Sequence, residues 1–250
     1  MTDDLPDLSP LEPVPEDWGT ALAIVAHPDD MEYGASAAVA HWTDQGKTVA
    51  YALVTAGEAG IDSMAPEECG PLRVREQYAA CEAVGVTDLQ ILGHPDGMLE
   101  HSLSLRADIA RAIRTVRPEV VITLNHRESF PGGGLNMADH IVTGQAVIDA
   151  VRDAANRWVF RALAEEEGLE PWGGVDAVLV ANSPRPTHAV PISEGDIDRA
   201  VASLEAHAAY LEGLGPGAMS DPAGFLRPLF AAAADRFGGR PAMTFELLPM

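Results

Sequence analysis

The stretch of sequence that decides the fold is Thr20–Ala26 (TALAIVA), which runs directly into His27–Glu32 (HPDDME). The first segment is continuously apolar after its threonine, and this pattern predicts a strand buried on both faces. A helix-like stretch follows at residues 31–45. Because ligands bind outside the carboxyl ends of strands in open α/β sheets, we expect the functional site at the HPDD turn between strand and helix.

Strand-like and helix-like segments alternate along the rest of the chain. We predict further strands at 48–54, 88–92, 119–124 and 175–180, and further helices at 72–84, 103–116, 139–156 and 197–211. This alternation is typical of βαβ units and predicts an α/β fold, a single Rossmann-like domain with a mostly parallel sheet flanked by helices. We expect an acidic, Pro-rich N-terminal leader at 1–18 and one domain at 19–250, since no repeat or break in composition marks a second domain.

The composition excludes several classes of partner and chemistry. The chain carries 16 Lys and Arg against 38 Asp and Glu, a formal net charge of −22, and so acidic a surface repels phosphate backbones and anionic lipid headgroups. We therefore expect no nucleic-acid partner and no membrane partner. Lys47 is the only lysine, so Schiff-base, pyridoxal-phosphate and P-loop chemistry would all depend on it. Two cysteines, no long apolar run and no secretory signal predict a cytoplasmic protein.

The HPDD turn places one imidazole and two carboxylates where a dinucleotide-binding protein would carry a Gly-rich phosphate loop. Asp29 and Asp30 also suit a helix N-terminus, and capping alone would explain one of them. Capping does not account for His27 beside them, or for the rigid Pro28 that fixes their spacing. We therefore favour a metal site or an acid–base site over a helix cap.

A metal site needs more ligands than this turn offers, and His140 is the best placed of the other histidines. It follows the strand at 119–124 and a Gly-rich loop, and it stands at the start of a predicted helix. His41 falls within a helix, where packing explains it, and His101 has no partner nearby in sequence. Two histidines and one aspartate leave a coordination position for water, which is typical of a hydrolytic zinc site.

Several short motifs occur in the order that is typical of one enzyme family. They are HPDDMEYG at 27–34, TAGEAG at 55–60, RVRE at 73–76 with VGV at 84–86, LGHPDG at 92–97, RPEVV at 117–121, and DH at 139–140. Through them the chain resembles the PIG-L/LmbE-like de-N-acetylases over about residues 20–211. These are metal-dependent amidases that remove acetyl groups from N-acetylglucosamine-type sugars.

The resemblance implies an LmbE-like fold with His27, Asp30 and His140 as metal ligands and Asp29 as the general base. Asp29 neighbours a ligand, so it can take a proton from metal-activated water without competing for the metal. Borderline nitrogen and oxygen ligands suit Zn²⁺ best, and Fe²⁺, Co²⁺ or Ni²⁺ also fit such a set.

One position departs from the family pattern. Where the family carries a histidine that stabilises the oxyanion, this chain carries Met137, and a thioether cannot donate a hydrogen bond. Either another donor substitutes or the oxyanion rests mainly on the metal. The candidates are His126, Arg127, Asn136 and His207, of which we favour His207 as a catalytic residue, the alternative being a packed helix residue.

The substrate-binding residues are expected near the same edge of the sheet. We assign this role to Glu58, Arg73, Asp96, His126 and Asn136. In the family the arginine contacts substrate, whereas its spacing from Glu76 equally suits a structural ion pair one helical turn apart. Glu58 follows a strand and would hold sugar hydroxyls or orient a ligand, and Asp96 belongs to a Pro-Asp-Gly turn that would line the site.

We therefore predict a zinc-dependent deacetylase that hydrolyses the acetamide of an N-acetylglucosamine-type sugar or glycoside. One alternative is an amidase that acts on a non-sugar N-acyl compound or thiol conjugate. A second is a non-catalytic protein on the same fold that binds a metal or small molecule. The expected partner is a small N-acetylated amino-sugar compound, and the negative charge disfavours a phosphoinositide. A homo-oligomer is compatible with the sequence.

Overall fold

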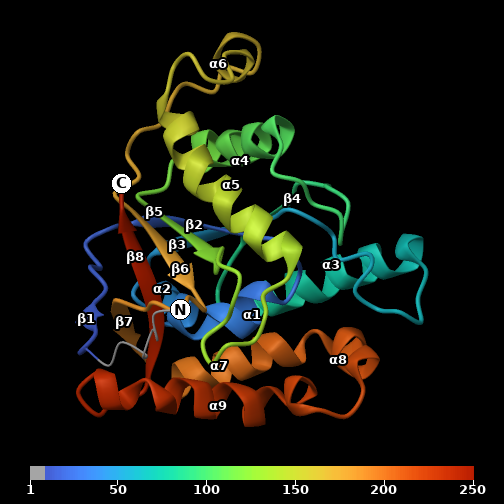
Figure 1. Cartoon of the computed structure of the whole chain (residues 1–250), viewed down its shortest axis with the longest axis vertical. Helices are drawn as coiled ribbons and strands as arrows, with labels where there is room; N and C mark the ends of the chain where they lie inside the picture. Colours follow the sequence, from blue (N-terminus) through green and yellow to red (C-terminus); the bar gives the residue numbers. More distant parts are fainter. Residues whose placement is uncertain (1–8) are drawn as a thin grey trace, which may run out of the picture.

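The computed structural model describes residues 9–250, and its central feature is one eight-stranded sheet (Figure 1). The strand order is β1-β7-β8-β6-β5-β2-β3-β4. The strands are β1 (Glu12–Pro13), β2 (Thr20–Val25), β3 (Thr48–Leu53), β4 (Asp88–Ile91), β5 (Val120–Leu124), β6 (Ala177–Ala181), β7 (His188–Pro191) and β8 (Ala242–Pro249). Strands β4, β3, β2, β5 and β6 pair in parallel, whereas β8 runs antiparallel to both β6 and β7.

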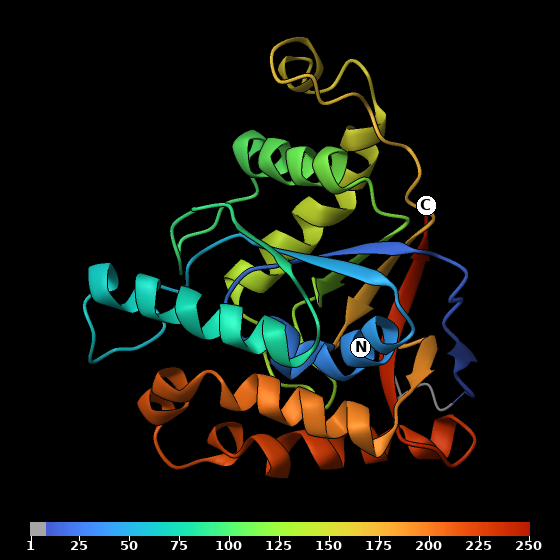
Figure 2. The same cartoon turned by 180° about the vertical axis from the view of Figure 1, so that it is seen from behind.

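Helices cover both faces of this sheet, as Figures 1 and 2 show from opposite sides. They are α1 (Asp30–Gly34), α2 (Ser36–Asp44), α3 (Pro66–Ala83), α4 (Leu103–Val116), α5 (Ala138–Ala155), α6 (Ala162–Glu165), α7 (Glu194–Glu205), α8 (Ala208–Leu214) and α9 (Pro222–Ala232). Two short 3₁₀ helices, η1 (Ala218–Ser220) and η2 (Ala234–Arg236), flank α9. No helix within residues 9–250 is both long enough and apolar enough to cross a bilayer.

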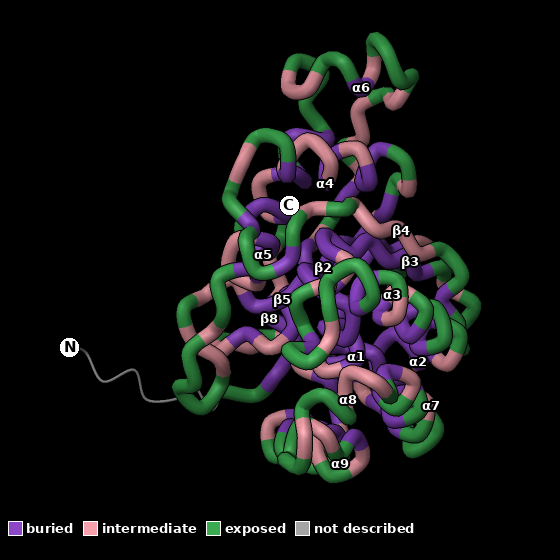
Figure 3. The backbone as a smooth tube through the Cα atoms, turned by 90° about the vertical axis from the view of Figure 1, so that its right-hand side faces the viewer, coloured by how far each residue is buried: buried purple, intermediate pink, exposed green. Residues whose placement is uncertain are grey.

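The α/β fold predicted from the alternation of segments is confirmed, and each predicted strand is present. Strand β2 is buried on both faces because its side chains alternate between two cores. Ala21, Ala23 and Val25 pack with α2, α7 and α9, and Leu22 and Ile24 pack with α4 and α5. In Figure 3 the sheet is accordingly the most continuously buried part of the tube.

The structure corrects several boundaries. The helix expected at 31–45 is divided at Ala35, whose φ of −152° is not helical, into α1 and α2. The helix expected at 197–211 ends at Glu205 and resumes at Ala208, because His207 has ψ of 48°. Strands β7 and β8 and helix α9 were not predicted, so the antiparallel part of the sheet is a finding of the structure.

The N-terminal residues that the structure describes lie against the sheet. Strand β1 pairs in parallel with β7, and the side chains of Leu11, Val14 and Trp18 are buried. The Trp18 ring packs edge-on against Trp42 with 5.2 Å between centroids. Residues 1–8 of the expected leader lie outside the described residues, so the division at residue 18 stays a prediction.

Candidate active site

The HPDD turn connects β2 to α1 at the carboxyl end of the strand. Asp29 adopts a left-handed backbone with φ of 85°, a conformation that non-glycine residues seldom take. Although it occupies the N-cap position of α1, its side chain makes no capping hydrogen bond. The Asp30 carboxylate accepts a hydrogen bond from the His27 backbone amide at 2.7 Å, which closes the turn on itself. Capping therefore does not account for Asp29, whose carboxylate is directed elsewhere.

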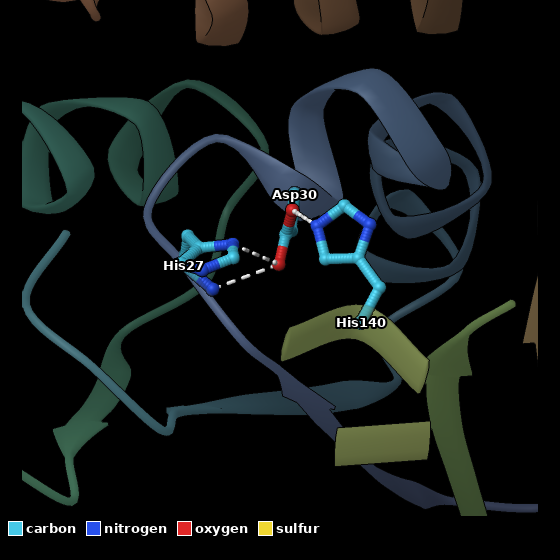
Figure 4. A group of neighbouring side chains, drawn as sticks. All are labelled: His27, Asp30 and His140. Carbon is cyan, nitrogen blue, oxygen red and sulfur yellow. Dashed lines mark hydrogen bonds and ion pairs between the residues drawn. The ribbon is translucent and has the colours of Figure 1, made fainter. Parts of the chain in front are cut away.

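Three ligand-type side chains converge beside this turn (Figure 4). His27 and Asp30 come from the turn and His140 from the first turn of α5, and one ligand atom from each lies within 4.8 Å of the others. His140 Nε2 is 2.9 Å from Asp30 Oδ1, and His27 Nδ1 is 3.5 Å from Asp30 Oδ2. The fold thus brings together the three residues that were predicted as metal ligands.

The hydrogen bonding of His140 is suited to metal binding. Asn136 Nδ2 donates to the backbone carbonyls of Asn125 and Arg127, which fixes Asn136 Oδ1 as the atom that faces His140 Nδ1 at 3.1 Å. Because that oxygen can only accept, Nδ1 carries a proton, and in the neutral imidazole Nε2 then presents its lone pair. This buried Nε2 makes no hydrogen bond despite the nearby carboxylate of Asp30. A lone pair that faces an anionic oxygen fits a shared cation, so the donor set fits a divalent metal.

His27 is held from its other side by two carboxylates. Its Nε2 lies 3.1 Å from Asp96 Oδ1 and 3.3 Å from Asp139 Oδ2. The Asp139 carboxylate also accepts hydrogen bonds from the backbone amides of Gly97 at 2.8 Å and Leu99 at 3.2 Å. Burial lowers the pKa of His27, but the carboxylates around it outweigh burial and raise the pKa to about 12. Carboxylates behind a metal-binding imidazole orient the ring and increase its basicity.

Asp29 is separate from this group and pairs with Arg73. Its Oδ2 accepts a hydrogen bond from Arg73 Nη2 at 2.9 Å, and its backbone amide donates to Gln77. Burial raises the pKa of the Asp29 carboxyl to about 6, although Arg73 acts in the opposite direction. A carboxylate with a pKa in this range exchanges protons readily near neutral pH.

Two glycines allow the Arg73 guanidinium to reach this position. A Cβ atom on Gly57 would lie 2.4 Å from Arg73 Nη1, and one on Gly60 would lie 2.3 Å from it. The guanidinium donates to the Gly57 carbonyl as well as to Asp29. The alternative ion pair with Glu76 is not formed, since Glu76 Oε1 accepts from the backbone amide of Ala209 at 2.6 Å. The glycines of the TAGEAG motif thus make room for the arginine beside Asp29.

Most of the remaining residues predicted to bind substrate instead hold other residues of the site in position. Glu58 Oε1 accepts from the backbone amide of Asp96 at 2.9 Å and so fixes the turn that carries this aspartate. Asp96 lines the cavity while it also faces His27, and Asn136 orients His140. His126 is not among the residues that line the cavity, and the backbone of α5 packs closely against it.

The four candidates for the missing donor at Met137 are not among the residues that line the cavity. His207 is fully buried, does not line the cavity and lies with its Nε2 3.5 Å from Glu32 Oε2. Burial lowers the pKa of His207, but Glu32 outweighs burial and raises it overall. Arg127 is engaged in an ion pair with Glu246. The structure thus corrects the expected position of His207, because the break between α7 and α8 turns it into the core.

A cavity of about 640 Å³ opens above this polar floor. Tyr210 of α8 and Asn182 after β6 line it and carry hydrogen-bond donors that sequence reasoning missed. The Arg73 guanidinium lies 4.3 Å from the centre of the Tyr210 ring, and the Tyr210 hydroxyl interacts with Asp29. Burial raises the pKa of the Tyr210 hydroxyl, so it stays a donor. Tyr210 lies three residues after His207, and this spacing is no signal for its role because the histidine is buried away from the cavity.

Sequence comparisons find a matching family model and similar proteins. Residues 22–151 match the family model PIG-L, described as GlcNAc-PI de-N-acetylase. The chain is 30% identical over 241 residues, 78% of this chain and 80% of the relative, to 1D-myo-inositol 2-acetamido-2-deoxy-alpha-D-glucopyranoside deacetylase of Acidothermus cellulolyticus. It is 37% identical over 137 residues to the probable N-acetyl-alpha-D-glucosaminyl L-malate deacetylase 2 of Bacillus cereus, a match that covers 52% of this chain and 60% of the relative.

A solved structure shares the fold over almost the whole chain. The N,N'-diacetylchitobiose deacetylase from Pyrococcus horikoshii superimposes with a TM-score of 0.80, covering 94% of this chain and 85% of that protein. At 22% sequence identity this likeness shows a shared fold and no more.

Proposed function

The chain belongs to the PIG-L family of GlcNAc-PI de-N-acetylases, and from this premise we propose that it is a metal-dependent deacetylase acting on an N-acetylglucosamine-type sugar or glycoside. The observation that carries the proposal is the grouping of His27, Asp30 and His140 at the floor of the cavity. Asp29 lies next to this group but is not part of it, since its carboxylate is hydrogen-bonded to Arg73. The two curated relatives named above are, by their names, deacetylases of N-acetylglucosamine compounds.

The proposed ligands of the metal are His27, Asp30 and His140, and Zn²⁺ fits their two nitrogens and one oxygen best, with Fe²⁺, Co²⁺ or Ni²⁺ as alternatives. A divalent ion in that position supplies Lewis acidity toward the acetyl carbonyl and toward the attacking water. Asp96 and Asp139 hold the His27 ring in place, and Asn136 holds His140, so the ligand geometry is set before substrate arrives.

Asp29 is the proposed general base. It accepts a proton as water attacks the acetyl carbon, and it returns this proton to the nitrogen as the C–N bond breaks, which yields acetate and the free amine. The hydrogen bond from Arg73 fixes the direction of the carboxylate, and the guanidinium favours its ionised form. We propose that Arg73 acts mainly through Asp29, because its guanidinium is buried and hydrogen-bonded to protein oxygens.

Tyr210 is the proposed replacement for the donor that Met137 cannot provide. It lines the cavity, and its hydroxyl interacts with Asp29 before reaction. Once Asp29 has taken a proton, its carboxyl is a weaker acceptor, and the Tyr210 hydroxyl is free to turn to the developing oxyanion. A donor used only at that stage stabilises the transition state more than the bound substrate.

The experiment that tests the proposal measures acetate and free amine released from N-acetylglucosamine glycosides by the purified protein. Incubation with a chelator should abolish release, and stoichiometric Zn²⁺ should restore it. A parallel panel of non-sugar N-acyl amines separates the sugar deacetylase from a general amidase. Release from the non-sugar amines alone would overturn the proposed substrate class.

A cytoplasmic location and a homo-oligomer remain predictions. The buried cysteines Cys69 and Cys81 form no disulfide.

A further inference from the structure

The part of the cavity that lies beyond the polar floor is more apolar than an amino sugar requires. Its walls present the side chains of Tyr33, Phe130, Pro131, Met137, Met219, Phe225 and Leu229. We propose that these side chains, here called the apolar wall, bind an uncharged alkyl or aryl aglycone attached to the sugar. The inference rests on the proposed function and narrows its substrate class to an amphiphilic glycoside.

The exposure of the wall supports this assignment. Met137, Met219 and Leu229 keep 48%, 42% and 38% of their surface accessible, although they all face one cavity. Single exposed apolar residues are common, but a contiguous set around one opening marks a site for an apolar ligand. Methionine side chains adapt their shape to the group that they contact, which suits a flexible alkyl chain.

Contacts within the protein hold the apolar wall in place before any ligand binds. The Tyr33 hydroxyl donates to the Met219 carbonyl at 2.6 Å, and the Tyr33 ring packs edge-on against Phe225 with 5.4 Å between centroids. Helix α9 is capped by Asp221, whose carboxylate accepts from the backbone amide of Gly224 at 3.0 Å. A preformed apolar surface binds a ligand without first losing conformational freedom of its own.

The wall is continuous with the catalytic floor. Phe130 stands edge-on to the proposed ligand His140, with 6.2 Å between ring centres, so the loop before α5 borders both. In Figures 1 and 2 this loop reaches toward α7 and α9, and residues from the loop and from α9 line the same cavity. A cavity of about 640 Å³ is of the size that buries drug-like molecules, which leaves room for a group beyond one hexosamine.

The side-chain charges of the cavity disfavour an anionic aglycone. Asp29, Asp30 and Asp96 line it, and Arg73 is the only lysine or arginine among the described lining residues. Its guanidinium is already bound to Asp29 and to the carbonyls of Pro28 and Gly57. Apart from the metal proposed for the floor, a phosphate on the substrate would therefore meet carboxylates and no unpaired arginine or lysine, whereas an uncharged apolar group would meet the wall.

The test compares the octyl and methyl glycosides of N-acetylglucosamine, the former below its micelle-forming concentration. Deacetylation of the octyl glycoside should show kcat/KM about tenfold or more above that of the methyl glycoside, as for several methylenes in an apolar site. Calorimetry on the chelator-treated protein should show the same preference in Kd, independently of turnover. Leu229→Ser should lower the octyl-to-methyl ratio about fivefold in both measurements.

A matched control is Leu214→Ser, because Leu214 is similarly exposed at 42% but does not line the cavity, and it should keep the ratio. Equal kcat/KM and equal Kd for the two glycosides would overturn the aglycone site while the deacetylase stands. Absence of turnover with a persistent octyl preference in Kd would overturn the proposed function and leave the apolar site intact.

Discussion

The polar floor of the cavity and its apolar wall differ in how their side chains are held and, in part, in where they come from in the chain. The floor is formed at the ends of β2 and β3 and at the start of α5, all within the matched family region 22–151. Three of the seven wall side chains, Met219, Phe225 and Leu229, come from η1 and α9, which lie beyond that region. The other four come from α1 and the loop before α5, within it. Floor side chains are buried and fixed by hydrogen bonds, whereas wall side chains are half exposed and held by packing. In our proposal the floor therefore determines the reaction, and the wall determines which substrate is selected.

The largest expected effect comes from a change in the floor that removes a metal ligand. His140→Ala should lose most of the bound metal and all measurable turnover, because the two remaining ligands hold a divalent ion weakly. Metal content by mass spectrometry checks this, and binding of the octyl glycoside should persist since the wall is unaltered. Full metal occupancy in this variant would contradict the ligand assignment.

A second change in the floor leaves the ligands intact. Asp29→Asn should retain metal and lower kcat by about 10²–10⁴-fold, since the amide cannot accept the proton. The readout is acetate release measured at a fixed metal content. Turnover at the wild-type rate would show that another group is the base.

The third change lies where floor and wall meet. Tyr210→Phe should lower kcat by about 10²-fold with little change in KM, because the lost donor acts only in the transition state. Tyr33→Phe is the matched control, since the Tyr33 hydroxyl holds Met219 in the wall. It should reduce the octyl preference and not kcat on the methyl glycoside. Equal effects of the two variants on kcat would argue against Tyr210 as the oxyanion donor.

The smallest expected effect concerns the support of a ligand. Asn136→Ala should weaken metal binding by about 10–100-fold, because His140 loses the partner that fixes its tautomer. Competition with a chromophoric chelator measures the affinity. At saturating metal the variant should recover much of its activity, and an unchanged affinity would remove Asn136 from the metal site.

Much of the floor could be predicted from the sequence because it follows strand ends. TALAIVA and the following HPDD turn fix the position of His27, Asp29 and Asp30, and a parallel sheet brings the start of α5 to the same edge. His140 could therefore be assigned without contacts. Asp139 is adjacent to it in sequence, but its role depends on a long-range approach to His27.

The wall and the donor could not be predicted in this way. Strand β8 and helix α9 follow a Gly- and Pro-rich stretch in which no periodic pattern was recognised, and β8 joins the sheet from far away in sequence. The prediction for His207 is made alongside a single continuous helix at 197–211. In the structure the helix is interrupted at His207. The histidine is buried, and Tyr210 of the following helix α8 lines the cavity.

The left-handed backbone at Asp29 limits which amino acids can replace it. Asparagine adopts this conformation more readily than most residues, whereas β-branched residues are strained there. Its side-chain oxygen can also still accept from Arg73. The variant Asp29→Asn should therefore be inactive while it keeps the shape of the floor, because only a carboxylate oxygen is replaced by an amide nitrogen. Immobilised and exposed to a metabolite extract, it would retain the uncleaved glycoside, which mass spectrometry could then identify.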